Sequence, residues 1–438
     1  MYLPPYVENC ISALEAQGFA AYAVGGCVRD ALLGLTPHDY DLCTAATPEQ
    51  IKAIFADHTL VLAGEKHGTV GVVTQGEVVE ITTFRREGDY LDNRHPERVD
   101  FVTDVTQDLA RRDFTVNAMA YSPSRGFADP FGGREDLARK VLRAVGEPAQ
   151  RFREDSLRIL RGVRFAVRFG LETEETTGRA MEELAPLMDN LARERVMDEL
   201  CKLLPAVQAE DLVRYAPIVC QVIPELAATV GFQQRNPHHI YDVYTHTAHV
   251  VAAVPPQLPL RWAALLHDVG KPDTFTLDDQ GLGHFYGHGA QSARMADAIL
   301  RRLKASNDLR ERVVTLVEQH MTRLPADKKQ LRRRLSRLGE EMLLDLLDLQ
   351  AADFGGKGVE ASEDQAEVRR LLAEILAEES CLGLKDLAVN GRDLMALGYA
   401  GPEIGRMLQR LLELVLDEQL PNDKAALLAA AERERGTI

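Results

Sequence analysis

Short runs rich in apolar and β-branched residues, separated by polar turns, mark the first third of the chain. Between residues 20 and 145 these runs are AAYAVGG, HTLVLAG, GTVGVVTQ, EVVEITTF and DFVTDV. Runs of this length that end at Gly or polar residues are typical of strands, and helical stretches lie between them. The pattern therefore predicts an α/β or α+β domain in this part of the chain.

A helical pattern replaces the strand pattern after Glu147. Segments such as SLRILRGVRFAVRFG and VMDELCKLLPAV carry apolar residues at helical spacing. Gly and Pro residues indicate breaks at 146–148, 232–237 and 354–356. The remaining two thirds of the chain should be almost wholly helical and should end in a small separate helical tail.

Composition narrows the class of protein. Apolar residues make up 45% and charged residues 27% of the 438 residues, as in ordinary soluble proteins. The sequence shows no apolar run of about 18 residues and no signal-peptide pattern at its start, so we expect a cytoplasmic protein with no membrane partner. The six cysteines are scattered without a CxxC pair, which predicts reduced thiols.

The net charge of −16 argues against a protein that coats nucleic acid indiscriminately, because phosphate binding relies on Lys and Arg. An RNA partner must instead meet a local basic face. The stretch 301–337 is one candidate, with twelve Lys or Arg against four Asp or Glu. A solvated helix surface is the alternative interpretation of this stretch.

Two short motifs near the N-terminus predict a site for a nucleotide and a metal. In AVGGCVRDALLG, Gly25 and Gly26 lie between an apolar strand and a helix, where backbone N–H groups can approach an anion, and Arg29 adds a positive charge. In HDYDL, Asp39 and Asp41 alternate along an expected strand and share one face. Such a pair suits Mg²⁺ beside phosphate oxygens. Taken singly, each motif has a structural alternative, a tight turn or a solvated strand end.

GGCVRD followed by DYD resembles the active site of the DNA-polymerase-β-like nucleotidyltransferases, and specifically the class II tRNA nucleotidyltransferase and poly(A) polymerase branch. The resemblance implies an α+β fold whose head has a mixed sheet with helices, and Mg²⁺ held by the catalytic Asp39 and Asp41. RRDFTVNAMAY resembles the second motif of this family. By that similarity Arg112 contacts the nucleotide, while Asp113 and Asn117 bind the ribose hydroxyls. A buried salt-bridge and cap cluster is the alternative.

The segment EDSLRILRGVRFAVRFG resembles the EDxxR motif of the same family. The resemblance implies that Asp155 and Arg158, three residues apart on one helix, pair with the incoming base in place of a template strand. It also implies that Arg161 and Arg164 contact the triphosphate or the tRNA backbone. An intrahelical ladder of ion pairs is the alternative for all four residues.

A second set of residues lies in the helical part of the chain. In sequence order its members are His246, His267-Asp268, His288, His320 and Asp353. This order resembles an HD phosphohydrolase domain. The likeness marks four of them as metal ligands, namely His246, His267, Asp268 and Asp353, and such a set suits a second divalent transition metal. The alternative is a helical scaffold for tRNA with an inert centre.

The resemblance covers nearly the whole chain and implies four segments. They are a nucleotidyltransferase head (1–146), a helical neck with the base-templating motif (147–215), an HD-type helical body (216–356) and a helical, tRNA-binding tail (357–438). The implied function is template-independent addition of CCA to the 3′ end of tRNA from CTP and ATP, with release of pyrophosphate and an accessory HD phosphohydrolase activity. The sequence leaves the oligomeric state open.

Three alternatives remain from the sequence. A poly(A) polymerase shares the head motifs, but the acidic chain with an HD body argues against it. A split CC- or A-adding enzyme is the second, although residues 82–104 resemble the flexible element that the family needs for the final A. A protein that acts primarily as an HD metal phosphohydrolase is the third.

Overall fold

The computed structural model describes residues 1–87, 99–236, 240–356, 363–378 and 381–435. Part of the expected flexible element, residues 88–98, lies outside these ranges, as does the start of the expected tail after residue 356. The chain divides into two compact units, Met1–Ala227 and Ala228–Ile438. The four segments expected from the sequence are finer than this division and stay a prediction.

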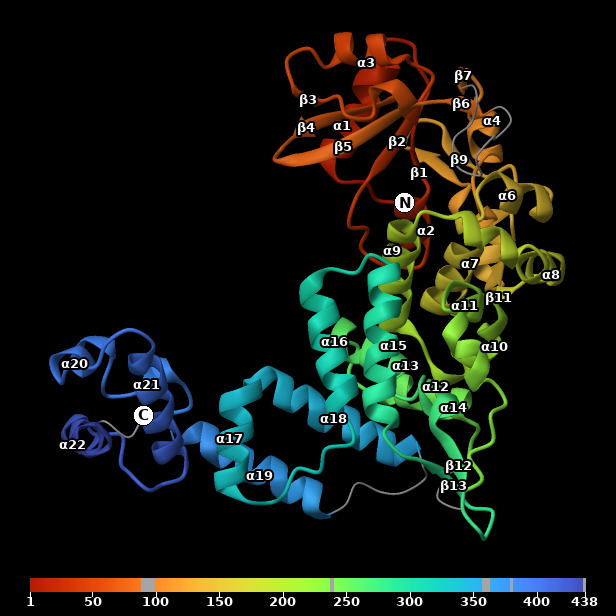
Figure 1. Cartoon of the computed structure of the whole chain (residues 1–438). Helices are drawn as coiled ribbons and strands as arrows, with labels where there is room; N and C mark the ends of the chain where they lie inside the picture. Colours follow the sequence, from red (N-terminus) through yellow and green to blue (C-terminus); the bar gives the residue numbers. More distant parts are fainter. Residues whose placement is uncertain (88–98, 237–239, 357–362, 379–380, 436–438) are drawn as a thin grey trace. The chain divides into compact units, whose positions relative to one another are not determined.

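Among the described residues of the first unit, seven strands form one mixed sheet in the order β3-β4-β5-β2-β1-β8-β9 (Figure 1). The strands are β1 (Ala21–Val24), β2 (Asp41–Thr44), β3 (Thr59–Val61), β4 (Thr69–Thr74), β5 (Glu77–Thr83), β8 (Ala120–Ser122) and β9 (Gly126–Ala128). β2 and β5 are parallel, and the other neighbouring pairs are antiparallel. A separate antiparallel pair joins β6 (Arg85–Glu87) and β7 (Val99–Phe101).

One face of this sheet is covered and the other carries acidic side chains. Along β5, Val79 and Ile81 are buried, whereas Val78 and Glu80 are exposed, as the two-residue period of a strand requires. The helices α1 (Pro5–Ala16) and α3 (Pro48–Ile54) pack against β1, β4 and β5. Glu80 is the register partner of Asp41 on β2. Cross-strand partners share a face, so these two carboxylates lie side by side on the open face.

Helices dominate the rest of the first unit. They are α2 (Gly26–Leu32), α4 (Val105–Ala110), α5 (Gly133–Ala138), α6 (Pro148–Glu154), α7 (Leu157–Phe169), α8 (Glu175–Glu183), α9 (Arg193–Leu203), α10 (Ala209–Arg214) and α11 (Ala216–Val222). α7 packs against α9 and ends at Gly170, whose φ of 60° favours glycine. A two-residue parallel bridge between β10 (Val141–Leu142) and β11 (Glu172–Thr173) brackets α6 and α7.

The second unit is helical apart from one hairpin in its described residues. Its helices are α12 (Val243–Ala253), α13 (Leu258–Leu266), α14 (Lys271–Thr274), α15 (His288–Arg302), α16 (Asn307–Gln319), α17 (Lys328–Leu338), α18 (Glu340–Gly356), α19 (Glu363–Ala377), α20 (Gly391–Ala396), α21 (Pro402–Leu416) and α22 (Lys424–Glu434). The hairpin pairs β12 (Phe275–Leu277) with β13 (Gly283–Phe285). The helical pattern of the sequence predicts this composition but misses the hairpin.

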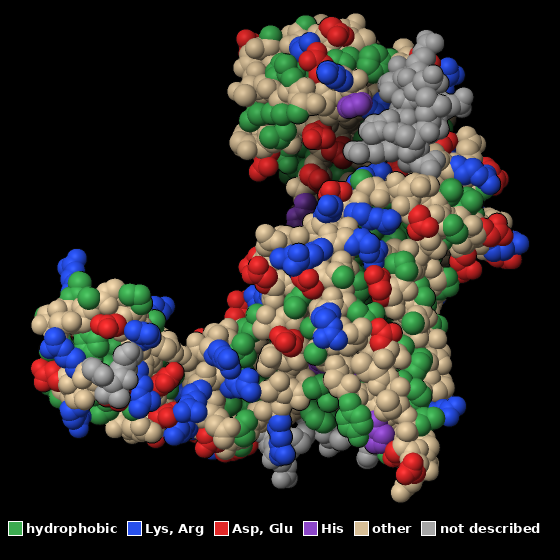
Figure 2. All heavy atoms as spheres, in the orientation of Figure 1, with side chains coloured by type: hydrophobic (Ala, Val, Ile, Leu, Met, Phe, Trp, Pro, Cys, Tyr) green, Lys and Arg blue, Asp and Glu red, His purple; other side chains and the backbone are tan. Residues whose placement is uncertain are grey.

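Acidic neighbours neutralise much of the basic helix α17. Arg333 makes a two-bond ion pair with Asp417 after α21, at 2.7 and 2.6 Å. Lys328 and Arg332 both bond Glu378, at 2.7 and 2.8 Å. Figure 2 shows Lys and Arg interspersed with Asp and Glu over α20–α22. The basic stretch predicted from the sequence is therefore engaged in ion pairs along α17.

The mixed sheet followed by helices confirms the predicted α+β fold class. Within the described ranges, no helix combines the length and the apolar content that crossing a membrane requires.

The tight packing of α7 generates a prediction about Gly162. A Cβ at this position would lie 2.9 Å from Phe114 Cζ and 3.1 Å from Met181 Cε. Because these neighbours are buried, we expect Gly162→Ala to lower the free energy of unfolding by about 1–3 kcal/mol. Gly178→Ala in α8 is the matched control, since its Cβ would meet Thr173 Cγ2 at 3.5 Å. Urea denaturation should show the loss only for Gly162→Ala; equal stabilities of the two variants would contradict it.

Candidate functional site

The Gly-Gly turn lies between β1 and α2, as the sequence predicts. Gly25 has a φ of 77°, and a Cβ there would lie 2.8 Å from Arg112 Nη1. The backbone conformation therefore favours glycine here, and the lack of a side chain lets this arginine approach closely. Gly26 begins α2. Arg112 is thus placed directly over the turn.

The Arg29 guanidinium is engaged by neighbouring side chains in this structure. Its Nη1 donates to Asn117 Oδ1 at 2.6 Å, and its Nε and Nη2 donate to Asp30 Oδ1. The guanidinium also lies 4.2 Å from the centroid of the Phe169 ring. Burial lowers the pKa of Arg29, although Asp30 opposes that effect. Arg29 is therefore a buried link between α2 and the motif around Asn117.

Asp39 and Asp41 both lie at the open side of the sheet, but only Asp41 belongs to a strand. The ladder of β2 begins at the Asp41–Glu80 pair, so the predicted strand starts two residues too early. Tyr40 between them is buried and both aspartates are exposed, which preserves their shared face. Desolvation by the surrounding protein, together with the charges of Asp39 and Glu80, raises the pKa of Asp41 to about 6. A divalent cation would relieve this crowding of carboxylates.

Asp113 and Asn117 form the centre of a buried polar network. Asn117 Nδ2 donates to Asp113 Oδ1 at 3.2 Å, and Arg161 donates to Asp113 Oδ2 at 2.9 and 2.7 Å. Burial alone would raise the pKa of Asp113, but the charge and hydrogen bonds of Arg161 hold it at about 2. The salt-bridge cluster that the sequence gives as an alternative is therefore formed in this structure.

The network continues from α7 to α9 through Glu199. Arg164 Nε donates to Glu199 Oε2 at 2.6 Å, and Arg161 Nη1 lies 3.8 Å from Glu199 Oε1. Glu199 is only 4% exposed. The ring of Phe165 lies among three guanidinium groups, those of Arg29, Arg161 and Arg164. These ion pairs join separate elements, so an intrahelical ladder is not what holds Arg161 and Arg164.

Asp155 and Arg158 do not share a helix, which corrects the prediction from the EDxxR motif. Asp155 is extended, with a φ of −147°, and ends α6, while Arg158 lies in the first turn of α7. The Asp155 carboxylate accepts the backbone N–H of Leu157 at 3.1 Å, which favours a break between the helices. Arg195 on α9 bonds Asp155 at 2.8 Å, and Glu154 bonds Arg158 at 2.8 Å. The two predicted base-pairing residues therefore have separate partners.

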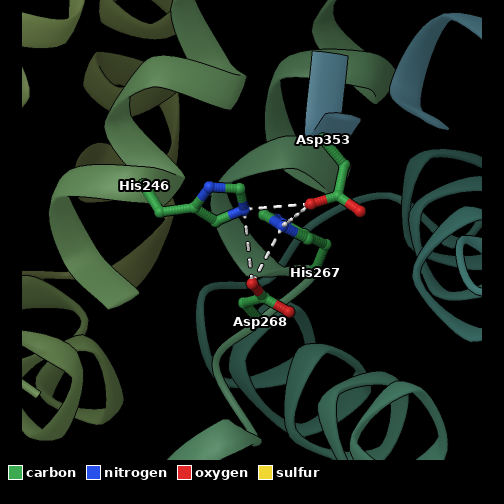
Figure 3. Close-up of side chains that lie close together, drawn as sticks. All are labelled: His246, His267, Asp268 and Asp353. Carbon is green, nitrogen blue, oxygen red and sulfur yellow. Dashed lines mark hydrogen bonds and ion pairs between the residues drawn. The ribbon is translucent and has the colours of Figure 1, made fainter. Parts of the chain in front are cut away.

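The second candidate centre is a buried cluster in the second unit (Figure 3). His246 lies on α12, His267 and Asp268 follow α13, and Asp353 lies on α18. His246 Nε2 is 3.0 Å from Asp353 Oδ1, and His267 Nε2 is 3.2 Å from Asp268 Oδ2. One ligand atom from each of the four residues lies within 4.8 Å of the others. The structure thus brings together the four residues that the HD resemblance marks.

Two further histidines, His288 and His320, lie beside this cluster, and their surroundings favour the neutral form of each ring. Burial and the charge of His267 lower the pKa of His320 to about 4, and burial also lowers the pKa of His288. Burial would raise the pKa of Asp268, but His267 and Lys271 keep it well below its usual value. Neutral imidazole and ionised carboxylate are the forms that bind metals.

Several residues of both centres escape the sequence motifs. Arg195 and Glu199 lie four residues apart on α9, and RERVMDEL reads as an ordinary charged helix. Only the fold shows that they meet Asp155 and Arg164. Lys271, three residues after Asp268 in HDVGKP, bonds Asp268 at 2.7 Å. The sequence does show this lysine three residues after the His-Asp pair.

The raised pKa of Asp41 generates a prediction about stability. The folded protein holds the Asp41 proton more tightly than the unfolded chain, whose pKa is about 3.9, so ionisation of Asp41 costs stability. The destabilisation by ionised Asp41 is absent below about pH 4 and fully present above about pH 6. In metal-free buffer we expect Asp41→Asn to raise the free energy of unfolding at pH 7.5 by on the order of 1 kcal/mol, since solvent screens part of the repulsion.

Calorimetry at pH 7.5 and pH 4 checks this expectation. The stabilisation should vanish at the lower pH, and Asp57→Asn, an exposed control, should change neither value. A gain of the same size at both pH values would show that carboxylate repulsion is not its cause.

Three family models match the chain in sequence order. Poly A polymerase head domain matches residues 21–143, and probable RNA and SrmB- binding site of polymerase A matches residues 170–216. The model for tRNA nucleotidyltransferase domain 2, putative, matches residues 287–431. The first match contains the Gly-Gly turn, Asp39, Asp41 and the motif around Asp113. Nucleotidyltransferases of this kind use a divalent metal, and the described residues offer candidate acidic and histidine ligands.

Relatives of known activity match over the whole length. The CCA-adding enzyme of Streptococcus thermophilus is 33% identical over 436 residues, which cover 98% of this chain and 97% of the relative. That of Geobacillus stearothermophilus is also 33% identical, with 99% and 98% covered. The crystal structure of the Bacillus stearothermophilus CCA-adding enzyme in complex with CTP matches with a TM-score of 0.72 and 29% identity, covering 99% of each chain. The chain therefore belongs to the family of CCA-adding enzymes, which are nucleotidyltransferases.

Proposed function

We propose that this chain adds CCA to the 3′ end of tRNA from CTP and ATP without a nucleic-acid template, releasing pyrophosphate. The observation that carries the proposal is the pairing of Asp39 and Asp41 beside the Gly25–Gly26 turn, in a chain 33% identical to CCA-adding enzymes over nearly its full length. Similar solved structures are named as complexes with CTP, with ATP and with tRNA. These names support the three substrates for this chain.

Asp39 and Asp41 would hold the Mg²⁺ ions of the reaction. The donor set fits, because Mg²⁺ prefers carboxylate oxygens and the crowded Asp41 carboxylate gains from a cation. Bound there, magnesium supplies charge neutralisation to the triphosphate and lowers the pKa of the attacking 3′-hydroxyl. The 3′-oxygen then forms a bond to the α-phosphorus as the bond to pyrophosphate breaks.

The protein's own residues would bind and orient the nucleotide around that pair. The Gly25 N–H donates to the Met119 carbonyl oxygen at 3.1 Å, so an anion would meet the N–H groups that follow the turn at the start of α2. Arg112, placed over Gly25, brings a positive charge to the same position. Asp113 and Asn117 would contact the ribose, and the contacts that already engage them restrict their rotamers. Preorganised polar groups lose less conformational entropy when a ligand binds.

Asp155 and Arg158 would read the base edge. Arg195 bonds both Asp155 oxygens, and Arg158 donates to Glu154 and to the carbonyl oxygens of Arg151 and Arg111. A base would therefore have to share or displace some of these contacts. Arg161 and Arg164 would support the triphosphate or the tRNA backbone through the network that includes Glu199. Arg195 on α9 holds Asp155, and Arg158 lies on α7. A small shift of α9 relative to α7 would therefore change the hydrogen-bonding groups that are offered to the base of CTP or ATP.

A second activity, hydrolysis of phosphate esters, has its own supporting observation. The four HD-type residues His246, His267, Asp268 and Asp353 are buried together, and structural side chains seldom form such a charged, metal-like set. An inert centre within a tRNA-binding scaffold is the competing interpretation. The segment assignments, the tRNA-binding tail and a cytoplasmic location remain predictions beside these two activities.

The nucleotidyl-transfer proposal predicts a defined product ladder. Full-length protein given tRNA that ends at the discriminator base should add C, C and A and then stop when CTP and ATP are both present. Asp39→Asn and Asp41→Asn should each lower the rate by about 10³-fold or more, since several kcal/mol of charge stabilisation is lost. Asp57→Asn is the surface control. Unlimited A tails would indicate a poly(A) polymerase, and a ladder that ends after CC would indicate a split enzyme.

The phosphohydrolase proposal predicts activity that is independent of the head. With Mn²⁺, Co²⁺ or Ni²⁺, the protein should hydrolyse p-nitrophenyl phosphate, and His267→Ala should reduce the rate by about 10²-fold or more. The Asp39→Asn/Asp41→Asn double variant should keep this rate. Absence of turnover with every metal in the correctly folded protein would favour the inert scaffold.

A further inference from the structure

The short helix α5 packs directly against the turn that joins Asp113 to Asn117. A Cβ at Gly133, the first residue of α5, would collide with the Thr115 carbonyl oxygen and would lie 2.8 Å from Met119 Cγ. Only a residue without a side chain allows the two backbones to approach so closely. The two residues proposed to contact the ribose therefore lie on either side of a residue that touches α5.

Thr115, between these two residues, uses each of its polar groups. Its backbone N–H donates to the Arg143 carbonyl oxygen at 2.9 Å, and its carbonyl oxygen accepts the Ala118 N–H at 2.9 Å. Its hydroxyl donates to Asp136 Oδ2 at 2.7 Å, and both side chains are buried. This length is typical of the strong bonds that a hydroxyl makes to an ionised carboxylate. The turn is thus attached to α5 through a side chain as well as through backbone packing.

Arg143 closes this arrangement into a ring. Its Nε donates to Asp136 Oδ2 at 3.2 Å, and the same oxygen accepts the Thr115 hydroxyl. Since the Arg143 carbonyl oxygen accepts the Thr115 N–H, each of the three residues bonds the other two. We call these three residues the support ring. A closed set of hydrogen bonds restricts the rotamers of all its members, because no member can rotate without breaking a bond.

The helix that carries Asp136 is itself fixed at its start. Asp129, directly after β9, accepts the backbone N–H groups of Gly133 at 2.7 Å and of Arg134 at 3.0 Å. A carboxylate that accepts the first N–H groups of a helix caps that helix. Through this cap and β9, the support ring is tied to the seven-stranded sheet.

The support ring holds the backbone from which Asp113 and Asn117 project. The Asp113 carbonyl oxygen accepts the N–H of Val145, two residues after Arg143, at 3.0 Å. The Asn117 side chain donates to the Asp113 carboxylate across the turn at 3.2 Å. A rotation of the turn would move these two side chains relative to each other. Release of the Thr115 hydroxyl should therefore change the hydrogen-bonding groups that the pair offers.

We propose that Thr115, Asp136 and Arg143 are positioning residues that hold Asp113 and Asn117 in the geometry that distinguishes ribose from 2′-deoxyribose. They act through these two side chains and do not touch the nucleotide. A site that hydrogen-bonds a substrate hydroxyl rejects the analogue without it only while its polar groups stay in place. The inference rests on the proposed nucleotidyl-transfer function and on the ribose contacts proposed with it.

The test compares CTP with 2′-deoxyCTP as substrates of the full-length protein, acting on tRNA that ends at the discriminator base. The measured quantity is the ratio of the two kcat/KM values for addition of the first C. Thr115→Val keeps the shape of the side chain but removes the hydroxyl. We expect it to lower the ratio by about tenfold, as the loss of a hydrogen bond to a charged group would. Thr115→Ser keeps the hydroxyl and should stay within about twofold of the parent ratio.

Two further variants keep the outcome decisive. Ser122→Ala removes another buried hydroxyl that donates to a carboxylate, that of Glu15 at 3.0 Å, and should leave the ratio unchanged. Arg143→Met opens the support ring at an exposed position and should lower the ratio even if Thr115→Val does not fold.

The outcomes separate the positioning role from the proposed function. Equal losses of kcat/KM with both nucleotides, or a parent ratio kept by both Thr115→Val and Arg143→Met, overturn the positioning role alone. A parent that uses both nucleotides equally well overturns it too. A parent that adds neither nucleotide contradicts the nucleotidyl-transfer function itself.

Discussion

The ion pair between buried Asp113 and half-buried Arg161 is the interaction on which the nucleotide-facing side of the first unit depends. Asp113 precedes the short turn that holds Asn117, and Arg161 lies in the middle of α7. Removing Arg161 leaves the buried Asp113 carboxylate without its ionic partner, which destabilises the fold. The pair is extended in both directions, through Asn117 to Arg29 and through Glu199 to Arg164. Residues proposed to contact the ribose and the triphosphate are thus held by one continuous network of ion pairs and hydrogen bonds.

The sequence predicts the fold class, and it marks the four residues that the structure brings together in the second unit, because both depend on local patterns. Three of these patterns can be recognised within a few residues of sequence. They are a Gly-Gly turn before a helix, alternating aspartates, and a His-Asp pair after an apolar helix. The α+β order follows from the change of apolar period near Glu147. The short β12–β13 hairpin is missed because each strand has only three residues, too few for a period to show.

The errors at the site have two physical causes, a local contact that breaks a helix and partners that are distant in the sequence. Spacing alone places Asp155 and Arg158 on one helix, but capping of Leu157 by the Asp155 carboxylate ends α6 first. The β2 ladder begins at Asp41 because its pairing with β5 starts at Glu80. Arg195 and Glu199 bond residues 35 to 40 positions away, a relation that only the packing of α7 against α9 creates.

The acidic neighbours of α17 bear on how long RNA stays bound. Arg333 and Lys328 already have carboxylate partners, so an RNA phosphate can reach them only by exchanging one anion for another. Such an exchange gains less free energy than filling an empty cationic site, and it shortens the residence time of any RNA held there. Basic side chains that already carry such partners add less to the affinity for RNA than unpaired ones would.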